Sequence, residues 1–332
     1  MIKIRKMIPV NVWAGVVFLA FLAIGSCRQK QERTMAHDAP IRIGLLNGPS
    51  AMSMVGLMES GCPGAGCEFI IRNEPDQIRA MMHRGELDIA FLPITMASLT
   101  YNRGFKYQLL GVSGWGALYL IGKNLGIGQI ADLKGKTVHM MGRGMTPDLL
   151  FRYLLSIAGL EPGKDIELNY SFPSHVELAN IVRAGRAELG VLSEPMASMV
   201  MAQNPELVQV LDLQAAWDSL QEQRISMPQT AVMINKTFAE NNRDAVSDLE
   251  KAMSDAIEWV RANPEESGKL IVKYGILPDE AVAALSVPRC NFAYQSAAEV
   301  KATLIDFYSL MAGLNPDSIG GSLPDDDFFY TR

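Results

Sequence analysis

Two stretches of this chain, 100 residues apart, carry the same pattern of residues. Residues 84–98 read RGELDIAFLPITMAS and residues 184–198 read AGRAELGVLSEPMAS. The matched pairs are Gly85 and Gly185, Asp88 and Glu188, Leu92 and Leu192, and the triplets Met96-Ala97-Ser98 and Met196-Ala197-Ser198. Solenoid repeats have much shorter periods, of roughly 20 to 50 residues, so a period of this length indicates two similar domains. The chain is therefore predicted to contain two related lobes.

The segments around each copy of the repeat predict alternating strands and helices. Apolar and β-branched runs, glycine stops and proline starts carry this pattern. Strands are predicted at 41–46, 67–72, 88–92, 137–141 and 166–170, and helices at 51–60, 75–83, 148–158 and 174–183. Such alternation is typical of an α/β layer, whose short apolar strands are buried on both faces. The predicted fold class is α/β, with two lobes that each hold a mostly parallel sheet flanked by helices.

Two segments are predicted to connect the lobes. Strand-like residues 107–113 and 117–122 flank Gly114-Trp115-Gly116 and suit a first crossing, and residues 226–235 suit a return crossing. Residues 244–262 and the segments up to Gly313 are helical by pattern, with proline breaks. Two crossing strands form a hinge that lets a cleft open and close. The predicted lobes are therefore 40–114 with 227–332 for lobe 1, and 115–226 for lobe 2.

The N-terminal segment has the layout of a secretory signal. Lys3, Arg5 and Lys6 precede an apolar stretch, which ends in Ile24-Gly25-Ser26-Cys27. This ending resembles a bacterial lipobox, which implies that residues 1–26 are a lipoprotein signal peptide and that Cys27 is lipidated. The alternative is an uncleaved membrane anchor, since the apolar run is nearly long enough to span a bilayer. Residues 27–39 are polar and suit a flexible tether, so we expect a periplasmic or cell-surface protein that is lipid-anchored to a bacterial membrane.

Charge and cysteine content narrow the function further. The segment 1–26 holds three of the 30 Lys and Arg residues and none of the 36 Asp and Glu residues, so its removal leaves a clearly acidic domain. An acidic domain lacks the electrostatic footprint that nucleic-acid binding requires.

Cys62 and Cys67 flank a Pro-Gly turn and suit a local disulfide in an oxidising compartment, with a metal or redox pair as the alternative. Cys290 suits a small buried apolar side chain.

Several motifs resemble one family of transport receptors. Residues 125–138, with the sequence LGIGQIADLKGKTV, resemble the DLKGK entry into the second lobe of type II periplasmic solute-binding proteins of ABC importers. More narrowly, the chain resembles the group of sulfonate, nitrate and taurine receptors and of binding proteins for the pyrimidine precursor of thiamine. Residues 85–90, 190–195 and 323–330 match phrases of that group.

The resemblance implies a function. The chain is expected to be the extracytoplasmic solute-binding lipoprotein of an ABC-type importer, and not an enzyme. It is expected to bind a small polar or zwitterionic organic solute between its lobes, sulfonate, taurine-like or aminopyrimidine-like, and to deliver it to a permease with its ATPase. A monomer without cofactor or metal is expected, in contact with the membrane through its lipid alone. The alternatives are an enzyme on the same fold, like those of menaquinone or thiamine synthesis, and a ligand-sensing lipoprotein without a permease.

Candidate ligand-binding residues follow from where α/β sheets bind ligands. Ligands lie at the carboxyl ends of strands, where helix N-termini offer free N–H groups and a partial positive charge. The residues at such turns are Gly48, Pro49, Ser50, Thr95, Arg143, Thr146, Ser193 and Glu194. Thr146 and Glu194 precede prolines that suit the first helical position, so both are predicted N-caps. For Ser50, Thr146 and Glu194, the alternative is a capping role alone.

Four of the candidates have side chains that suit particular ligand groups. Arg143 suits a carboxylate, sulfonate or phosphate, with a solvated surface arginine as the alternative. Glu194 suits an ammonium group or an amino-heterocycle, and together the two charges predict a zwitterionic or mixed donor and acceptor ligand. Trp115 and Phe172 suit stacking on a planar ligand, with packing in the hinge or lobe as the alternative.

Overall fold

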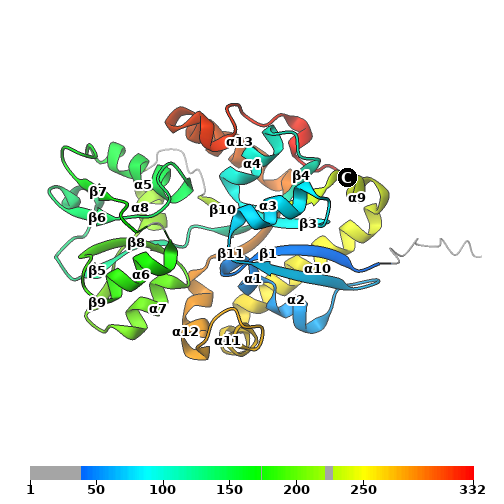
Figure 1. Cartoon of the computed structure of the whole chain (residues 1–332), viewed down its shortest axis with the longest axis horizontal. Coiled ribbons are helices and arrows are strands. Elements are labelled where there is room, and N and C mark those ends of the chain that lie inside the picture. Colours follow the sequence, from blue (N-terminus) through cyan, green and yellow to red (C-terminus); the bar gives the residue numbers. More distant parts are fainter. Residues whose placement is uncertain (1–38, 173, 221–226) are drawn as a thin grey trace, which may run out of the picture. The chain divides into compact units, whose positions relative to one another are not determined.

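The computed structural model describes residues 39–172, 174–220 and 227–332 (Figure 1). Its strands form a sheet of six and a sheet of five. We call the first sheet and its helices lobe 1, and the second sheet and its helices lobe 2. The predicted signal peptide, the lipidation site Cys27 and nearly all of the predicted tether lie outside the described residues.

Lobe 1 is built from two segments of the chain. Its strands are β1 (Ile41–Leu46), β2 (Cys67–Arg72), β3 (Ile89–Pro93), β4 (Tyr107–Trp115), β10 (Pro228–Asn235) and β11 (Phe292–Ser296). Its helices are α1 (Pro49–Ser53), α2 (Val55–Ser60), α3 (Pro75–His83), α4 (Ile94–Asn102), α9 (Lys236–Asn241), α10 (Arg243–Ala262), α11 (Pro264–Lys273), α12 (Glu280–Ser286) and α13 (Ala297–Leu314). Three short 3₁₀ helices complete it, η2 (Val287–Arg289), η3 (Pro316–Ile319) and η4 (Asp326–Phe328).

Lobe 2 is smaller and comes from the middle of the chain. Its strands are β5 (Leu118–Lys123), β6 (Thr137–His139), β7 (Glu167–Asn169), β8 (Leu189–Ser193) and β9 (Leu207–Asp212). Its helices are η1 (Ile130–Leu133), α5 (Thr146–Ile157), α6 (His175–Arg183), α7 (Met196–Gln203) and α8 (Leu213–Leu220).

The two sheets share one topology. The order in lobe 1 is β2-β1-β3-β10-β4, with β11 beyond β4, and the order in lobe 2 is β7-β6-β8-β5-β9. In each lobe the first three strands are parallel, and the next strand along the sheet is antiparallel. The predicted two-lobed α/β fold is confirmed. Both sheets are mixed, because β10 and β11 in lobe 1 and β5 in lobe 2 run against the other strands of their sheet.

The repeated stretches occupy equivalent places in the two lobes. Each contains a helix end, a turn, a buried strand and the start of the next helix. Gly85 ends α3 and Gly185 ends α6, both with φ of 68°, a left-handed conformation that glycine adopts without strain. Their N–H groups donate to the carbonyls of Met82 and Val182, at 3.0 Å in both cases. The repeat in the sequence is therefore a repeat of structure.

The strand β11 is the largest error in the predicted elements, because the sequence pattern favoured helices up to Gly313. Residues 292–296 instead pair antiparallel with β4 and extend the sheet of lobe 1. Five residues between two helical segments give too little periodicity to separate a strand from a helix. Pairing with β4, which is distant in the sequence, decides the conformation. The predicted helix 51–60 is also interrupted, since it forms α1 and α2 with a break at Met54.

The first crossing between the lobes consists of Gly116 and Ala117, between β4 and β5. Both have left-handed backbones, with φ of 56° and 61°. The N–H of Gly116 donates to the carbonyl of Met227 at 2.8 Å, so the crossing is bonded to the start of the returning chain. A Cβ atom at Gly116 would lie 2.8 Å from the side-chain oxygen of Gln214, so this position favours glycine. The residues just before Met227, 221–226, lie outside the described part.

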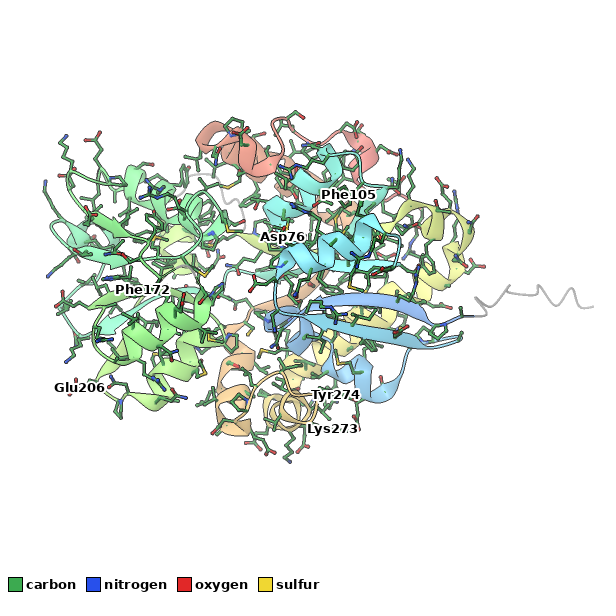
Figure 2. All side chains as sticks on the ribbon, viewed as in Figure 1. Asp76, Phe105, Phe172, Glu206, Lys273 and Tyr274 are labelled. Carbon is green, nitrogen blue, oxygen red and sulfur yellow. A yellow bond between two sulfur atoms is a disulfide. The ribbon has the colours of Figure 1, made fainter. Side chains whose placement is uncertain are left out.

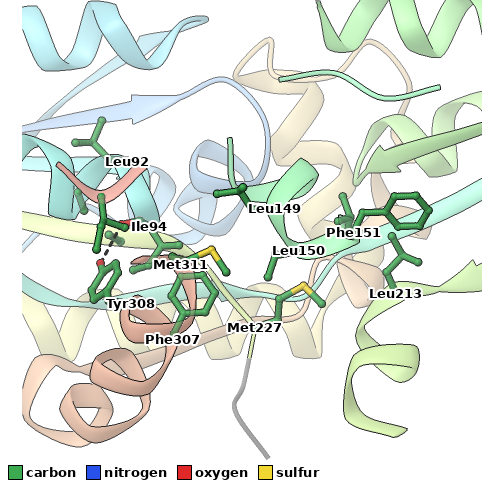
Figure 3. Close-up of a cluster of buried hydrophobic side chains, with 14 of the residues drawn as sticks. Leu92, Ile94, Leu149, Leu150, Phe151, Leu213, Met227, Phe307, Tyr308 and Met311 are labelled. Atoms are coloured by element: carbon green, nitrogen blue, oxygen red, sulfur yellow. Dashed lines mark hydrogen bonds between the residues drawn. The ribbon is translucent and has the colours of Figure 1, made fainter. Parts of the chain in front are cut away.

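A hydrophobic cluster joins the two lobes (Figure 3). It includes Leu149 and Leu150 of α5 in lobe 2, together with Phe307 and Met311 of α13 in lobe 1, all nearly inaccessible to water. Contact between α5 and α13 brings these side chains into one core. Burial of such side chains stabilises by roughly 1.5–3 kcal/mol each. The lobes therefore share apolar packing as well as polar contacts.

The cysteines of the described residues have two environments. Cys62 and Cys67 form a disulfide in the turn between α2 and β2. Cys290 is a free thiol and is buried beside β11, as expected for a small apolar side chain.

Candidate functional site

The N-termini of α4 and α5 meet between the lobes. Thr95 of α4 and Thr146 of α5 have hydroxyl oxygens 2.7 Å apart, and both residues are buried. Each helix follows a strand end of its own lobe, directly after β3 for α4 and a short loop beyond β6 for α5. Thr146 is the first residue of α5, and Met145 is the N-cap. The predicted capping role of Thr146 is therefore wrong, because its hydroxyl bonds to the opposite lobe.

The turn after β1 is closed by its own hydrogen bonds. Gly48 is the N-cap of α1, with φ of 124°, and Pro49 is the first helical residue. The Ser50 hydroxyl donates to the carbonyl of Leu46 at 2.9 Å and accepts from the N–H of Leu46 at 3.0 Å. Ser50 is buried. It holds the end of β1 against α1, and does not cap the helix.

A buried carboxylate organises the loop before α5. Asp148, almost fully buried, accepts from the Gly144 N–H at 2.7 Å and from Arg152 Nε at 2.8 Å. The Tyr170 hydroxyl donates to the same carboxylate. Burial, together with the hydrogen bond to Asp148, raises the pKa of Tyr170 to about 12. Sequence reasoning missed Asp148. Its position in the first turn of a helix, directly after Thr146-Pro147, was the signal that could have identified it.

Arg143 lies on this organised loop and is exposed. Its guanidinium carbon is 4.5 Å from the centre of the Tyr170 ring, a cation–π geometry. No ion pair joins Arg143 to a carboxylate among the described residues. The loop therefore presents a cation whose charge is not neutralised by a described acidic side chain, next to the N-terminus of α5.

Glu194 lies at the start of the turn after β8. Its side chain is fully buried and pairs with Arg289 of lobe 1. Its Oε1 accepts from Arg289 Nε of η2 at 2.5 Å, and its Oε2 accepts from the Ser198 N–H at 3.2 Å. Burial raises the pKa of the Glu194 carboxyl, and the hydrogen bonds from Arg289 and Ser198 oppose that rise. Pro195, not Glu194, is the N-cap of α7. The predicted N-cap position is therefore wrong by one residue, although Glu194 still accepts from a backbone N–H in the first turn of α7 while it pairs with Arg289.

Arg289 contacts three strands or strand ends of lobe 2. Besides Glu194, its Nη1 donates to Gln209 Oε1 of β9 at 2.8 Å. Its guanidinium carbon lies 4.2 Å from the ring centre of Tyr119 in β5, and the Tyr119 hydroxyl donates to the Arg289 carbonyl at 2.8 Å. Sequence reasoning missed Arg289 because nothing local to residues 287–290 indicates partners that are 80 or more residues away.

The two predicted stacking residues make packing contacts. Trp115 is half-buried at the end of β4, and its Nε1 donates to the Ala293 carbonyl at 2.9 Å. Phe172 lies on lobe 2 (Figure 2), half-buried, with its ring centre 6.0 Å from that of His139. Ser193 is half-buried at the end of β8, where it pairs with Leu118.

A cavity of about 330 Å³ lies on lobe 1, near the end of α4 and the C-terminal tail. Most of its charged lining is already paired, since Lys236 bonds to both carboxylate oxygens of Asp327 and Tyr101 donates to Asp325. Lys106 also lines the cavity. The cavity is therefore a weaker ligand candidate than the turns between the lobes. The described residues contain no group of three or more His, Cys, Asp and Glu placed to hold a metal ion. Among them, no helix combines the length and apolar character needed to cross a bilayer.

Comparison with known proteins places this geometry among transport proteins. Residues 57–273 match a family model described as ABC transporter, phosphonate, periplasmic substrate-binding protein. A solved structure of an ABC transporter from Parabacteroides distasonis is 29% identical and has a TM-score of 0.78, covering 89% of this chain and 100% of that chain. The periplasmic aliphatic sulphonate binding protein SsuA from Escherichia coli shares the fold at 19% identity, with a TM-score of 0.65, 88% of this chain and 96% of that chain.

Two further proteins show the same resemblance. The periplasmic nitrate-binding protein NrtA from Synechocystis PCC 6803 shares the fold at 16% identity, with a TM-score of 0.60, 85% of this chain and 84% of that chain. The putative binding protein YtlA of Bacillus subtilis (strain 168) is 28% identical over 131 residues, which are 39% of this chain. The match spans 36% of YtlA.

Proposed function

Because this chain belongs to the family of phosphonate-type periplasmic substrate-binding proteins of ABC transporters, we propose that it binds one small organic solute between its lobes. The proposed solute is polar or zwitterionic, of the sulfonate, taurine-like or aminopyrimidine-like kind. It is captured without chemical change and delivered to a membrane permease. The relatives that support this proposal are receptors for sulphonate and nitrate, and they share the two-lobed fold.

The contact between Thr95 and Thr146 carries the proposal. It brings the N-termini of α4 and α5, from opposite lobes, to one place. Helix N-termini carry a partial positive charge and free N–H groups, so they suit an acidic group on a solute. Arg143 adds a full positive charge to the α5 terminus. Gly48, Pro49, Ser50, Trp115, Phe172, Ser193 and Glu194 complete the proposed binding set.

The proposed mechanism is closure around the solute. The crossing at Gly116 and Ala117 and the return toward Met227 form the hinge. A solute shifts the open and closed populations only by its difference in affinity for the two, so groups from both lobes must touch it. Thr95 and Thr146 are proposed to be such groups, since they come from different lobes and lie together. The closed form is then the one that the permease binds.

The ends of the lobes and the membrane attachment belong to the same proposal. We propose the lobe boundaries predicted from the sequence, 40–114 with 227–332 for lobe 1 and 115–226 for lobe 2, except that Trp115 belongs to lobe 1 as the last residue of β4. Residues 1–26 form the signal peptide, Cys27 carries the lipid, and 27–39 are the tether. Cys27→Ala tests the anchor, because the variant is expected to move from the membrane fraction to the soluble fraction. Retention of that variant in the membrane fraction would favour the uncleaved anchor.

A thermal-shift and calorimetry panel tests solute binding. Sulfonates, phosphonates, taurine and aminopyrimidines are each added to the purified protein, and a true ligand at 100 times its Kd stabilises by about 2.7 kcal/mol. Arg143→Gln is expected to weaken an anionic hit at least tenfold, and exposed Arg186→Gln serves as the matched control. If no small solute stabilises the protein, the proposal fails. Product formation from any of them would support the enzyme alternative.

A further inference from the structure

The contacts of Arg289 join one residue of lobe 1 to three segments of lobe 2. Its side chain is 27% exposed, while the Glu194 side chain that it meets is fully buried. Gln209 and Tyr119 hold the guanidinium from the other sides. A buried carboxylate is tolerated only when it is paired. Lobe 1 therefore supplies the counter-ion of a lobe 2 carboxylate.

This pairing changes the charge that the site offers to a solute. From sequence, Glu194 favours an ammonium group, but Arg289 already bonds to its Oε1. A tethered partner acts at an effective concentration of about millimolar or higher, so a free ammonium group competes poorly with it. The Arg289 charge also repels an incoming cation. Arg143, which no carboxylate among the described residues neutralises, adds a positive charge beside the N-terminus of α5.

One nitrogen of Arg289 still has donor capacity. Its Nη2 is buried and has no hydrogen-bond partner among the described residues. Buried donors without a partner are rare, because each one loses its hydration without compensation. Protein atoms cover this donor in the present arrangement, so a solute reaches it only where these atoms move aside. An oxygen of an anionic group could then accept from it, whereas an ammonium group has no acceptor. The same guanidinium thus disfavours a cationic group and favours an oxyanion.

We propose that Arg289 determines the charge selectivity of the site between the lobes: it neutralises Glu194 from the opposite lobe, and so selects anionic solutes over those that need an ammonium contact. The inference rests on the proposed function and narrows its solute class to sulfonates or phosphonates. It also gives Arg289 a second effect, because the pair holds the lobes together without help from a solute.

Two pairs of probes that differ by one amino group test the selectivity. They are ethanesulfonate against taurine, and ethylphosphonate against 2-aminoethylphosphonate, each measured by calorimetry on the purified protein. The wild type is expected to bind the amine-free member at least as tightly. Arg289→Gln frees the Glu194 carboxylate, and is expected to shift the affinity ratio toward the amine by at least about tenfold. Arg289→Gln combined with Glu194→Gln is expected to remove that shift, as in a double-mutant cycle.

Controls separate selectivity from a general loss of structure. Arg289→Lys keeps the charge and is expected to keep the wild-type preference, and Arg261→Gln, an exposed change on α10, is expected to alter nothing. Circular dichroism and thermal unfolding check that each variant folds. A wild type that prefers the amine in both pairs by tenfold or more, with a ratio unchanged in Arg289→Gln, would overturn the proposal.

A measurement without solute distinguishes this inference from the proposed function. Spin labels on exposed Val176 of α6 and Glu240 of α9 report the distance between the lobes by pulsed electron resonance. Arg289→Gln is expected to lengthen or broaden that distance distribution, and Arg261→Gln is not. If none of the four probes binds, the proposed solute class is wrong. The distance measurement then decides by itself whether Arg289 holds the lobes together. Opening in Arg289→Gln then supports the pairing role, and identical distributions refute it.

Discussion

At the scale of single residues, two buried carboxylates organise contacts within lobe 2 and between the lobes. Asp148 joins the Gly144 loop, Arg152 and Tyr170, while Glu194 joins the two lobes through Arg289. Removing one member of such a group leaves another without its partner, which is usually more destabilising than removing the whole group. Single substitutions at these buried carboxylates should therefore lower the free energy of unfolding more than substitutions at exposed ion pairs do.

Asp148→Asn tests the carboxylate that holds the α5 loop. The amide keeps the size of the side chain but loses the charge that accepts from Arg152 and Tyr170, so we expect a loss of about 1–3 kcal/mol in the free energy of unfolding. The pKa of Tyr170, raised to about 12 mainly by burial and next by Asp148, should fall. Urea denaturation and ultraviolet titration measure the two effects. Asp255→Asn, at an exposed ion pair, is the control, and an equal loss there would contradict the role of Asp148.

Glu194 predicts a pH dependence of stability. Burial raises its carboxyl pKa above the ordinary value of 4.5. The folded chain then holds this proton at a pH where the unfolded chain has lost it, so the contribution to stability declines as pH rises from about 4.5 through the folded pKa. It is constant above that pKa. Denaturation of the wild type and of Glu194→Gln from pH 4 to 8 measures the difference. A difference that grows in favour of the wild type with rising pH would refute the direction.

The sequence allowed prediction of those parts of the candidate site that depend on short-range patterns. The repeat with its strand ends located Thr95 and Ser193, and the turn before the next helix located Thr146. Arg289 and the partners of Asp148 were missed, because their contacts join residues far apart in the chain. No short-range pattern in the sequence encodes the distance between Arg289 and Glu194. The sequence predicted Thr146 and Glu194 as N-caps, whereas in the structure both bond to the opposite lobe and neither is the N-cap residue.

At the scale of elements, the C-terminal tail shows how tertiary contacts decide structure. Residues 323–330 contain no periodic pattern, yet Phe328 and Phe329 are buried and Phe329 bridges to Leu109 of β4. The last residue, Arg332, pairs with buried Glu250 of α10 at 3.0 Å. By contrast, β1, β2 and α3 lie where the sequence predicts them, since alternation and proline starts are local signals. Elements with local signals were predicted, and those made by packing were not.

The tail should stabilise lobe 1 mainly through its aromatic residues. Phe328→Ala removes a fully buried ring and is expected to reduce the free energy of unfolding by about 3–5 kcal/mol. Arg332→Ala should cost less, about 1 kcal/mol, because the arginine is largely exposed and solvent screens its charge. Chemical denaturation of both variants gives the order. A larger loss for Arg332→Ala than for Phe328→Ala would show that the ion pair dominates.

At the scale of the whole molecule, the two lobes share one topology, and the first crossing that connects them has an unusual backbone. The first crossing has two left-handed residues, Gly116 and Ala117, and a third, Asn291, packs against it with φ of 48°. The Ala117 carbonyl accepts from the Glu194 N–H at 3.2 Å, so the crossing is bonded to the turn that Arg289 holds. The conformation of the hinge and the pairing across the lobes are therefore parts of one connected structure.

A matched pair of substitutions at the crossing tests whether its backbone sets the closed arrangement. Gly116→Ala places a Cβ atom 2.8 Å from Gln214 Oε1 and forces a left-handed alanine, so we expect a loss of about 1–2 kcal/mol. Ala117→Gly relieves left-handed strain of about 1 kcal/mol but loses a buried methyl worth about 0.8 kcal/mol. Its stability should therefore stay within about 1 kcal/mol of the wild type.

Denaturation measures the free energies of unfolding of the two variants, and the spin-label distance between Val176 and Glu240 measures the separation of the lobes. Only Gly116→Ala should broaden that distance, because only it conflicts with the closed backbone; equal broadening in both variants would mean that this crossing does not set the arrangement.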